Sequence, residues 1–229
     1  MIQECKFAYD TEVGDCTELK EFPALQLMTS ITLRIITRFI AGKELSRDQT
    51  FLNDTSSYFD GNFLTGFIML KLPFGNRVRE ILAWPLYKYH QHFRQQRLID
   101  RIKPIIARRM KESKAVHENA KSPEYDAVRT LLELLAQFPL DDKAAQDPLH
   151  TLSHEILQLL WAAGQSPAIS ITAVLFELLE KQEYLPVLQC EAEEAVAKCG
   201  WTHQALNELP IMDSFIRETH RVHPSFVRK

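Results

Sequence analysis

Apolar positions recur with helical spacing along almost the whole chain, and almost no segment alternates as a β-strand would. The first long example is residues 22–41, expected to form a mostly buried helix that stops at Gly42. Residues 46–48 then offer a cap for a second helix, which the turn at residues 60–62 is predicted to end. The pattern predicts an all-α protein.

A strongly basic helix is predicted from Phe93 to Lys114, after a break at residues 73–75 and a resumed apolar pattern over residues 78–87. Its basic face is typical either of a surface that meets a membrane or an acidic partner, or of a solvated face on a globular protein. The second interpretation is favoured because the apolar stripe lacks aromatic anchors. That stripe consists of Leu98, Ile102, Ile105, Ile106 and Met110.

Two polar segments interrupt the second half of the chain. Residues 113–124 and 139–148 contain few large apolar side chains and are predicted to be mobile loops. A short amphipathic helix is predicted between them, over residues 126–138. No repeat or low-complexity tract is present, so we expect one helical domain over residues 1–229.

The central helix of that domain is predicted from Ser153, as its N-cap, to Glu183. Apolar residues cover nearly every face of this segment, a pattern typical of a helix that is buried on all sides. Pro167 cannot donate to the carbonyl of Ala163, and its ring presses on that turn, so the helix should kink or open there. The prediction is therefore a long central kinked helix.

The residues around this kink are the strongest candidates for a site. Three small residues leave space, while Gln165 and Ser166 add an amide and a hydroxyl. Two interpretations remain open, a small-molecule site or a structural kink satisfied by a buried water. The small residues are Ala162, Ala163 and Gly164.

A second informative helix is predicted over residues 209–224, with Pro210 in its first turn. Glu218 and Arg221 are three apart, so the carboxylate can meet the guanidinium, although most such pairs are surface ion pairs of small energetic effect. Four residues of this helix are expected to face a core: Phe215, Ile216, Thr219 and Val222.

The composition argues against several functional classes of protein. The chain has 229 residues, a net charge of −3 and seven glycines, with no glycine-rich phosphate loop. The weak acidity argues against general binding of nucleic acid, which needs an excess of Lys and Arg. Two strongly apolar stretches, residues 25–41 and 63–74, are short or interrupted by charges, so neither is interpreted as a membrane span.

No metal site is predicted. His150 and His154 are four apart, but HEIL is not HExxH and no second ligand pair is visible. The widely spaced cysteines suggest reduced thiols rather than a zinc site or disulfides. These are Cys5, Cys16, Cys190 and Cys199.

In their order along the chain, these segments resemble the cytochrome P450 monooxygenases, especially the fungal microsomal type of secondary metabolism. Residues 34–52, RIITRFIAGKELSRDQTFL, are similar to a fungal segment of that family. The kinked helix resembles the long helix over the haem, and ELPIMDSFIRETHRVHP is similar to the E-x-x-R helix. The resemblance covers nearly the whole chain and implies a partial cytochrome P450 fold, its helical half.

The resemblance also implies roles for the candidate residues. Ser166 stands where a threonine hydroxyl helps deliver protons to dioxygen, and Gln165 stands where an acid or a histidine sits, so both are expected to be catalytic. Glu218 and Arg221 match the structural E-x-x-R pair, which is held by a partner from a later segment. The residues expected to lie against the cofactor are Ala162, Ala163 and Gly164.

The sequence also departs from the family pattern. An uncharged Gln165 cannot relay a proton as an acid can, and Pro167 replaces a second hydroxyl residue. The F-x-x-G-x-x-x-C-x-G segment that presents the thiolate ligand of the haem iron is not found, nor are the W-x-x-x-R helix and the membrane anchor. We therefore expect a truncated cytochrome P450-like chain that binds no haem stably.

Two functional hypotheses follow. In the first, the parental reaction is haem-dependent monooxygenation of a lipophilic terpenoid or polyketide-like substrate, with electrons from cytochrome P450 reductase, and this chain is not catalytic. In the second, the chain is a haem-free small-molecule-binding or interaction protein, or a non-functional remnant. The full-length family implies the endoplasmic reticulum membrane, whereas this chain is expected to be cytoplasmic or aggregated.

Overall fold

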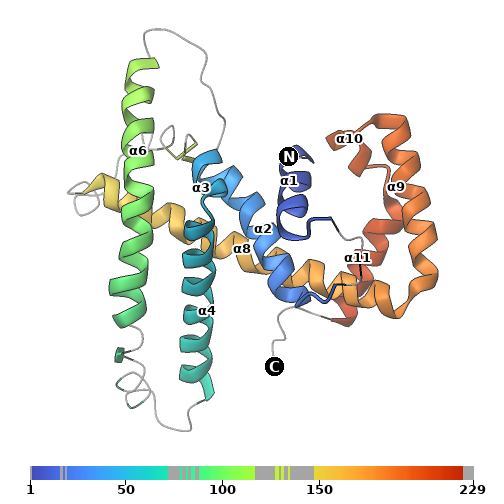
Figure 1. Cartoon of the computed structure of the whole chain (residues 1–229), viewed down its shortest axis with the longest axis horizontal. Coiled ribbons are helices and arrows are strands. Elements are labelled where there is room, and N and C mark those ends of the chain that lie inside the picture. The colour runs from blue at the N-terminus through green and yellow to red at the C-terminus, as the bar shows by residue number, and fades with distance from the viewer. Residues whose placement is uncertain are drawn as a thin grey trace. The chain divides into compact units, whose positions relative to one another are not determined.

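The computed structural model describes residues 2–15, 18, 20–71, 78, 81, 84–85, 88–116, 127–128, 130–131, 134 and 147–223. Every regular element in these residues is a helix (Figure 1), which confirms the all-α prediction. Several predicted features lie outside the described residues: the break at 73–75, Cys16, most of the helix at 126–138 and Pro224.

Two compact units divide the chain. The middle unit is Thr32–Gln165, and the terminal unit combines Met1–Ile31 with Ser166–Lys229. Two helices contribute residues to both units: α2 (Ala24–Ile40) and α8 (Pro148–Glu180). The prediction of a single domain over residues 1–229 stays a prediction.

The middle unit has the largest apolar core. Besides its parts of α2 and α8 it contains α3 (Lys43–Arg47), α4 (Gln49–Lys71), the π-helix η1 (His90–Gln95) and α6 (Gln96–Val116). The predicted apolar stripe of α6 is buried, with Met110 packed against it. The largest fully buried side chains of this core include Tyr58, Phe51, Phe59, Leu33 and Leu157.

Local chemistry explains where α4 begins. Gly42, at a φ of 90° that favours glycine, follows α2 as predicted. Asp48 then caps α4, because its side-chain oxygen accepts the backbone N–H of Phe51 at 3.0 Å. The start of the second helix is therefore confirmed, with the five-residue α3 placed before it.

The predicted end of that helix at residues 60–62 is wrong, because α4 continues to Lys71. Gly61 lies inside the helix and is buried, and the Thr65 hydroxyl donates to its carbonyl at 2.7 Å. A glycine inside a helix costs about 1 kcal/mol relative to alanine. Packing in the interior of the unit overrides this local preference.

The terminal unit is built from shorter helices around the second part of α8. It contains α1 (Ile2–Glu12), a 3₁₀ turn η3 (Gln182–Tyr184), α9 (Leu185–Cys199), α10 (His203–Leu206) and α11 (Pro210–Val222). The helix predicted over residues 209–224 is thus α11, and Pro210 occupies its first turn as expected.

Helix α8 begins earlier than predicted. Asp147 accepts the N–H of His150 at 3.0 Å and caps the helix, whereas Ser153 lies inside it and donates to the Leu149 carbonyl at 2.6 Å. The helix is continuous through Pro167, so it does not open there, and a bend at Pro167 stays a prediction. Ser153 as the N-cap was wrong because Asp147 offers the same capping chemistry earlier in the chain.

Burial of α8 on all sides is also wrong. Leu159, Phe176 and Leu179 are 40%, 57% and 56% exposed. By length and composition α8 is the one helix of the described residues that is long and apolar enough to cross a membrane, a test that core helices of soluble proteins also pass. Within each unit, α8 therefore buries one face and leaves apolar residues on another.

The predicted mobile loops are described only at their edges. Residues 113–116 belong to α6, and residues 147–148 belong to the beginning of α8. The rest of both loops lies outside the described residues, so their mobility stays a prediction.

Candidate functional site

Gly164 is the buried member of the candidate motif on α8. A Cβ atom at this position would lie 3.0 Å from Cε2 of Phe59 and 3.5 Å from Cδ1 of Leu33. The missing side chain therefore lets α8 approach α4 and the second part of α2 closely. Its neighbours in the middle unit are protein side chains rather than open space, and contact between Gly164 and a cofactor stays a prediction.

The other motif residues differ in exposure. Ala162 and Ser166 are exposed, and they share one helix face because they are four apart. Ala163 and Gln165 are half-buried, and Nε2 of Gln165 is a buried donor without a partner in the described part of the chain. The exposed face of α8 that carries Leu159 therefore has only short side chains at Ala162 and Ser166.

The polar residues of the motif differ in the chemistry that they offer. The Ser166 Oγ can both donate and accept a hydrogen bond, whereas the amide of Gln165 can donate or accept but does not ionise. General acid–base catalysis needs a group whose pKa lies near the working pH. Of the two residues, only Ser166 can pass a proton along a hydrogen-bonded chain.

The predicted pair of Glu218 and Arg221 is formed on α11. Arg221 donates from Nε and Nη2 to the two carboxylate oxygens, at 2.8 and 2.6 Å. This fork holds the pKa of Glu218 below its ordinary value and raises that of Arg221. Both side chains are more than half exposed, so the pair stabilises the chain little by itself. A partner from a later segment stays a prediction.

The core face predicted for α11 is correct only in part. Thr219 is buried, and the half-buried ring of Phe215 lies 5.5 Å from the ring of Tyr184. Ile216 and Val222 are 36% and 45% exposed, so the prediction is wrong for them. The described residues of the terminal unit cover one side of α11 and not the other.

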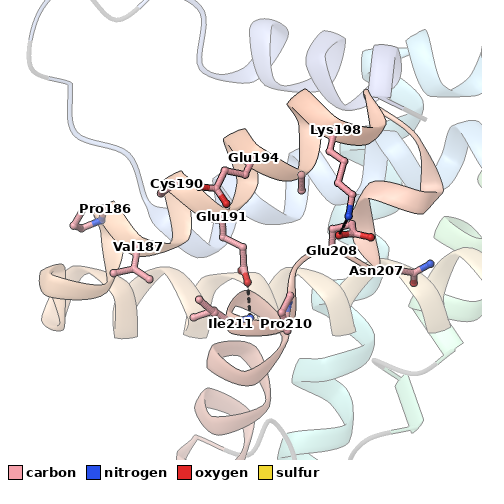
Figure 2. Close-up of a pocket in the computed structure, with 11 residues that line it drawn as sticks. Pro186, Val187, Cys190, Glu191, Glu194, Lys198, Asn207, Glu208, Pro210 and Ile211 are labelled. Atoms are coloured by element: carbon pink, nitrogen blue, oxygen red, sulfur yellow. Dashed lines mark hydrogen bonds and ion pairs between the residues drawn. The ribbon is translucent and has the colours of Figure 1, made fainter.

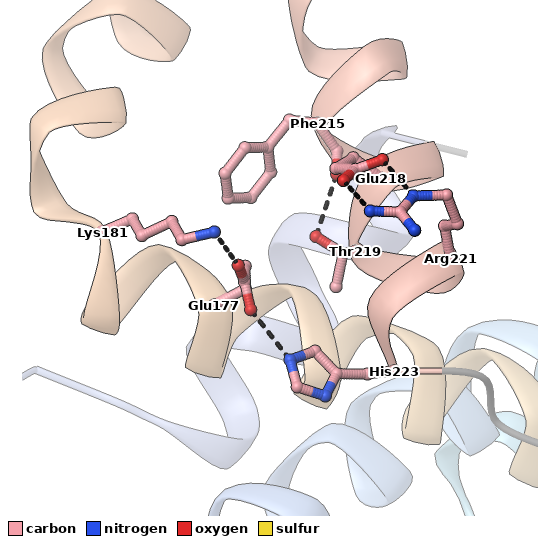
Figure 3. A network of polar contacts seen from close by, with 7 residues as sticks. All are labelled: Glu177, Lys181, Phe215, Glu218, Thr219, Arg221 and His223. Carbon is pink, nitrogen blue, oxygen red and sulfur yellow. Dashed lines mark hydrogen bonds and ion pairs between the residues drawn. The ribbon is translucent and has the colours of Figure 1, made fainter.

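A buried carboxylate that the sequence analysis missed joins α8 to α11 within the terminal unit. Figure 3 shows Glu177, only 7% exposed, between Nζ of Lys181 at 2.5 Å and Nε2 of His223 at 2.9 Å. On the same two helices, Ser170 Oγ lies 2.7 Å from Nε2 of His220. The sequence does contain one signal for this contact: Glu177 is an acidic residue in an apolar helix and lies four residues before Lys181, a spacing that favours an ion pair.

We predict that this carboxylate makes the terminal unit sensitive to acid. Hydrogen bonds from Lys181 and His223 lower the pKa of Glu177 below its ordinary value of 4.5, despite partial desolvation. A carboxyl whose pKa falls on folding stabilises the fold above pH 4.5, and that stabilisation is lost as the pH drops through the lowered pKa.

The measurement is urea unfolding between neutral and acid pH, followed by circular dichroism. Wild type should lose more stability below pH 4.5 than Glu177→Gln, which has no charge to lose there. Glu180→Gln, on the exposed end of the same helix, is the matched control and should follow wild type. Identical acid profiles for wild type and Glu177→Gln would contradict the prediction.

A groove of about 770 Å³ is lined by α9, by Asn207 and Glu208 after α10, and by the beginning of α11. Figure 2 shows these residues. Glu191 lines it and caps α11 by accepting the N–H groups of Ile211 and Met212, at 2.7 and 2.8 Å. The Cys190 thiol donates to Glu194, which raises the pKa of the thiol and keeps it protonated. None of the motif residues 162–167 lines this groove.

Comparison with known proteins decides the family. The family model described as Cytochrome P450 matches residues 12–228, nearly the whole chain. This chain belongs to the cytochrome P450 family. The roles that the resemblance implied for the motif on α8 and for the pair of Glu218 and Arg221 stay predictions.

Curated relatives of this cytochrome P450 chain come from fungi. It is 34% identical over 232 residues to cytochrome P450 monooxygenase sirB of Leptosphaeria maculans, covering 99% of the chain and 42% of that protein. It is 24% identical to an ent-kaurene oxidase of Gibberella intermedia, covering 99% of the chain and 40% of that protein. The chain thus spans about two fifths of the length of these relatives.

A solved structure shares the fold of this cytochrome P450 chain. The match is to retinoic acid bound cyanobacterial CYP120A1, with a TM-score of 0.62 and 19% sequence identity. It covers 96% of this chain and 44% of that one. The fold prediction, an all-α part of the cytochrome P450 fold, is therefore confirmed.

The family binds haem, and the described residues of this cytochrome P450 chain fit that group only on one side. Ala162 and Ser166 of the motif are exposed on α8. A haem-thiolate site also needs an ionised cysteine. The described cysteines are Cys5 on α1 and Cys190 and Cys199 on α9, and the thiol of Cys190 donates to Glu194, which raises its pKa.

Proposed function

We propose that this chain is the central helical part of a cytochrome P450 monooxygenase of fungal secondary metabolism. The observation that carries the proposal is the family match over residues 12–228, supported by fungal relatives that are named monooxygenases. The parental reaction is haem-dependent monooxygenation of a lipophilic substrate of terpenoid or polyketide type. A relative named ent-kaurene oxidase supports the terpenoid class.

In the parental enzyme the residues of α8 face the site of dioxygen chemistry. Haem with a thiolate ligand supplies the oxidising chemistry when it is bound. Ala162 and Ala163 keep the side chains of the helix small beside it, and Ser166 holds and passes a proton through Oγ. Gln165 offers a buried amide N–H that has no partner among the described residues. Gly164 instead lets α8 pack closely against Phe59. The paired side chains of Glu218 and Arg221 on α11 form the contact that a partner residue from another segment of the parental enzyme meets.

We further propose that this chain on its own is not catalytic, because the F-x-x-G-x-x-x-C-x-G segment that presents the thiolate ligand in the family is not found in its sequence. Glu194 holds the Cys190 thiol protonated, and the neutral amide of Gln165 weakens proton delivery. The remaining alternative is a haem-free protein that binds a lipophilic small molecule or a partner, or a remnant without function. The exposed apolar residues of α8 support the binding version of this alternative.

The test is to mix the purified chain with reduced haem and carbon monoxide and record the absorption spectrum. We expect no shifted Soret band of the thiolate-ligated type, because the sequence contains no F-x-x-G-x-x-x-C-x-G segment to present a cysteine to the iron. A thiolate-type band that disappears in Cys190→Ser would overturn the claim that this chain is not catalytic. Cys5→Ser, which removes an exposed thiol of α1, is the matched control.

Partners and location follow from the same proposal. A full-length form takes electrons from cytochrome P450 reductase and is held at the endoplasmic reticulum membrane. This chain by itself is cytoplasmic or aggregates, because large apolar side chains of α8 and α11 are exposed. Fractionation of cells that express the chain with a fluorescent tag tests this location.

A further inference from the structure

The basic helix α6 has no role in the function proposed above, yet its residues line a hollow in the middle unit. The hollow has a volume of about 440 Å³ and lies between α6 and the turn that joins α2 to α3. Arg108 and Arg109 come from α6, and Lys43 and Arg47 come from α3. Two segments far apart in the sequence therefore bring four cationic side chains to one concave surface.

The wall of this hollow is held in place by buried and cross-linking contacts. Arg34, 3% exposed, donates to the carbonyl of Ser46 at 3.1 Å and to Gln49 at 2.5 Å, which fixes α3 on α2. Asp48 accepts from Arg101 of α6 at 3.2 Å. Because these contacts hold α3 against α6, the two segments that carry the cations are in place before any ligand binds.

The lining residues that the structure describes include four cationic side chains and one carboxylate. Glu44 is the single carboxylate among the lining residues that the structure describes, and it contacts Arg108 at 2.8 Å. Arg47 and Arg109 are half-buried, so their charges are screened less than those of fully exposed side chains. The remaining lining residues are apolar or small: Ala41, Gly42 and Ile105.

We propose that this hollow binds a phosphate group, either of a soluble phosphorylated molecule or of a phospholipid headgroup. A dianionic group with several acceptor oxygens matches a set of guanidinium forks and one ammonium, and such charge-assisted hydrogen bonds are the strong ones. A hollow of about 440 Å³ takes a headgroup-sized ligand. This site is separate in sequence from the motif on α8 and does not depend on haem.

The test with a soluble probe is titration of the full chain with pyrophosphate by isothermal calorimetry at low salt. We expect saturable one-to-one binding that weakens as salt increases. Arg47→Gln and Lys43→Gln should each weaken it about tenfold, because each removes a charge-assisted contact. Glu44→Gln should strengthen it, since it removes the one described carboxylate of the lining.

Lys103→Gln is the matched control. Lys103 lies on the same helix, pairs with Asp100 at 3.9 Å and does not line the hollow, so its loss should leave pyrophosphate binding unchanged. Circular dichroism checks that each variant is folded. Because Lys43 is exposed, Lys43→Gln keeps the test valid if Arg47→Gln fails to fold.

Vesicle sedimentation distinguishes the two sources of phosphate. One outcome is binding to phosphatidylcholine vesicles that contain phosphatidic acid, weakened in Lys43→Gln, without binding of pyrophosphate; it supports the lipid headgroup. Binding of pyrophosphate that is weakened about tenfold in the same variant supports a soluble ligand. The proposal is overturned if neither probe binds, or if Lys43→Gln and Arg47→Gln bind as tightly as wild type.

Discussion

Truncation of Phe59 to alanine is expected to destabilise the middle unit by about 3–5 kcal/mol. The ring is fully buried in the core of that unit, where it lies against Gly164 and its centroid is 6.1 Å from that of Tyr58. Its removal costs the transfer free energy of a phenyl group and leaves a cavity that close-packed neighbours refill only in part.

Urea unfolding followed by circular dichroism measures this effect on the full chain. Phe39→Ala is the matched control, because Phe39 is 38% exposed on α2 and its loss should cost under about 1 kcal/mol. Equal losses for the two variants would mean that Phe59 is not the buried anchor between α4 and α8. If the slope of the unfolding free energy against urea concentration is the same as in wild type, both variants unfold from an equally compact state.

Much of the helical architecture could be predicted from the sequence where local chemistry marks an element. Pro210 marks the first turn of α11, Gly42 follows the end of α2, and the apolar stripe of α6 is buried as its period indicates. The end of α4 could not be predicted, because residues 60–62 have the composition of a turn. Burial of Gly61 in the core decides the outcome, and burial depends on the rest of the fold.

Some features of the candidate site could also be predicted from the sequence, and others could not. The motif on α8 and the pair of Glu218 and Arg221 could be located, since their residues are neighbours along one helix. The contact of Glu177 with His223 joins residues that are 46 apart, so no local pattern contains it. The exposed faces of α8 could not be predicted either, because an apolar pattern indicates a preference for burial and not the presence of a neighbour.

Gly164 gives the second large expected effect. Gly164→Val should destabilise the middle unit by about 1–3 kcal/mol, because the added side chain meets a closely packed contact. The first added carbon would already lie 3.0 Å from Cε2 of Phe59. Valine adds two more carbon atoms there, so α8 must move away from α4 or the ring must leave its favoured rotamer. Urea unfolding of the full chain measures the loss.

Gly66 provides the control, since it also lies inside a helix but a Cβ atom added to it would have no neighbour within 4 Å among the described residues. Gly66→Ala should stabilise α4 by about 0.5–1 kcal/mol, the ordinary gain for replacing a helical glycine. Combining Gly164→Val with Phe59→Leu should recover part of the loss, because the smaller side chain vacates the space that valine needs. If the changes in the free energy of unfolding of the two single variants simply add in the double variant, the contact between Gly164 and Phe59 does not hold α8 against α4.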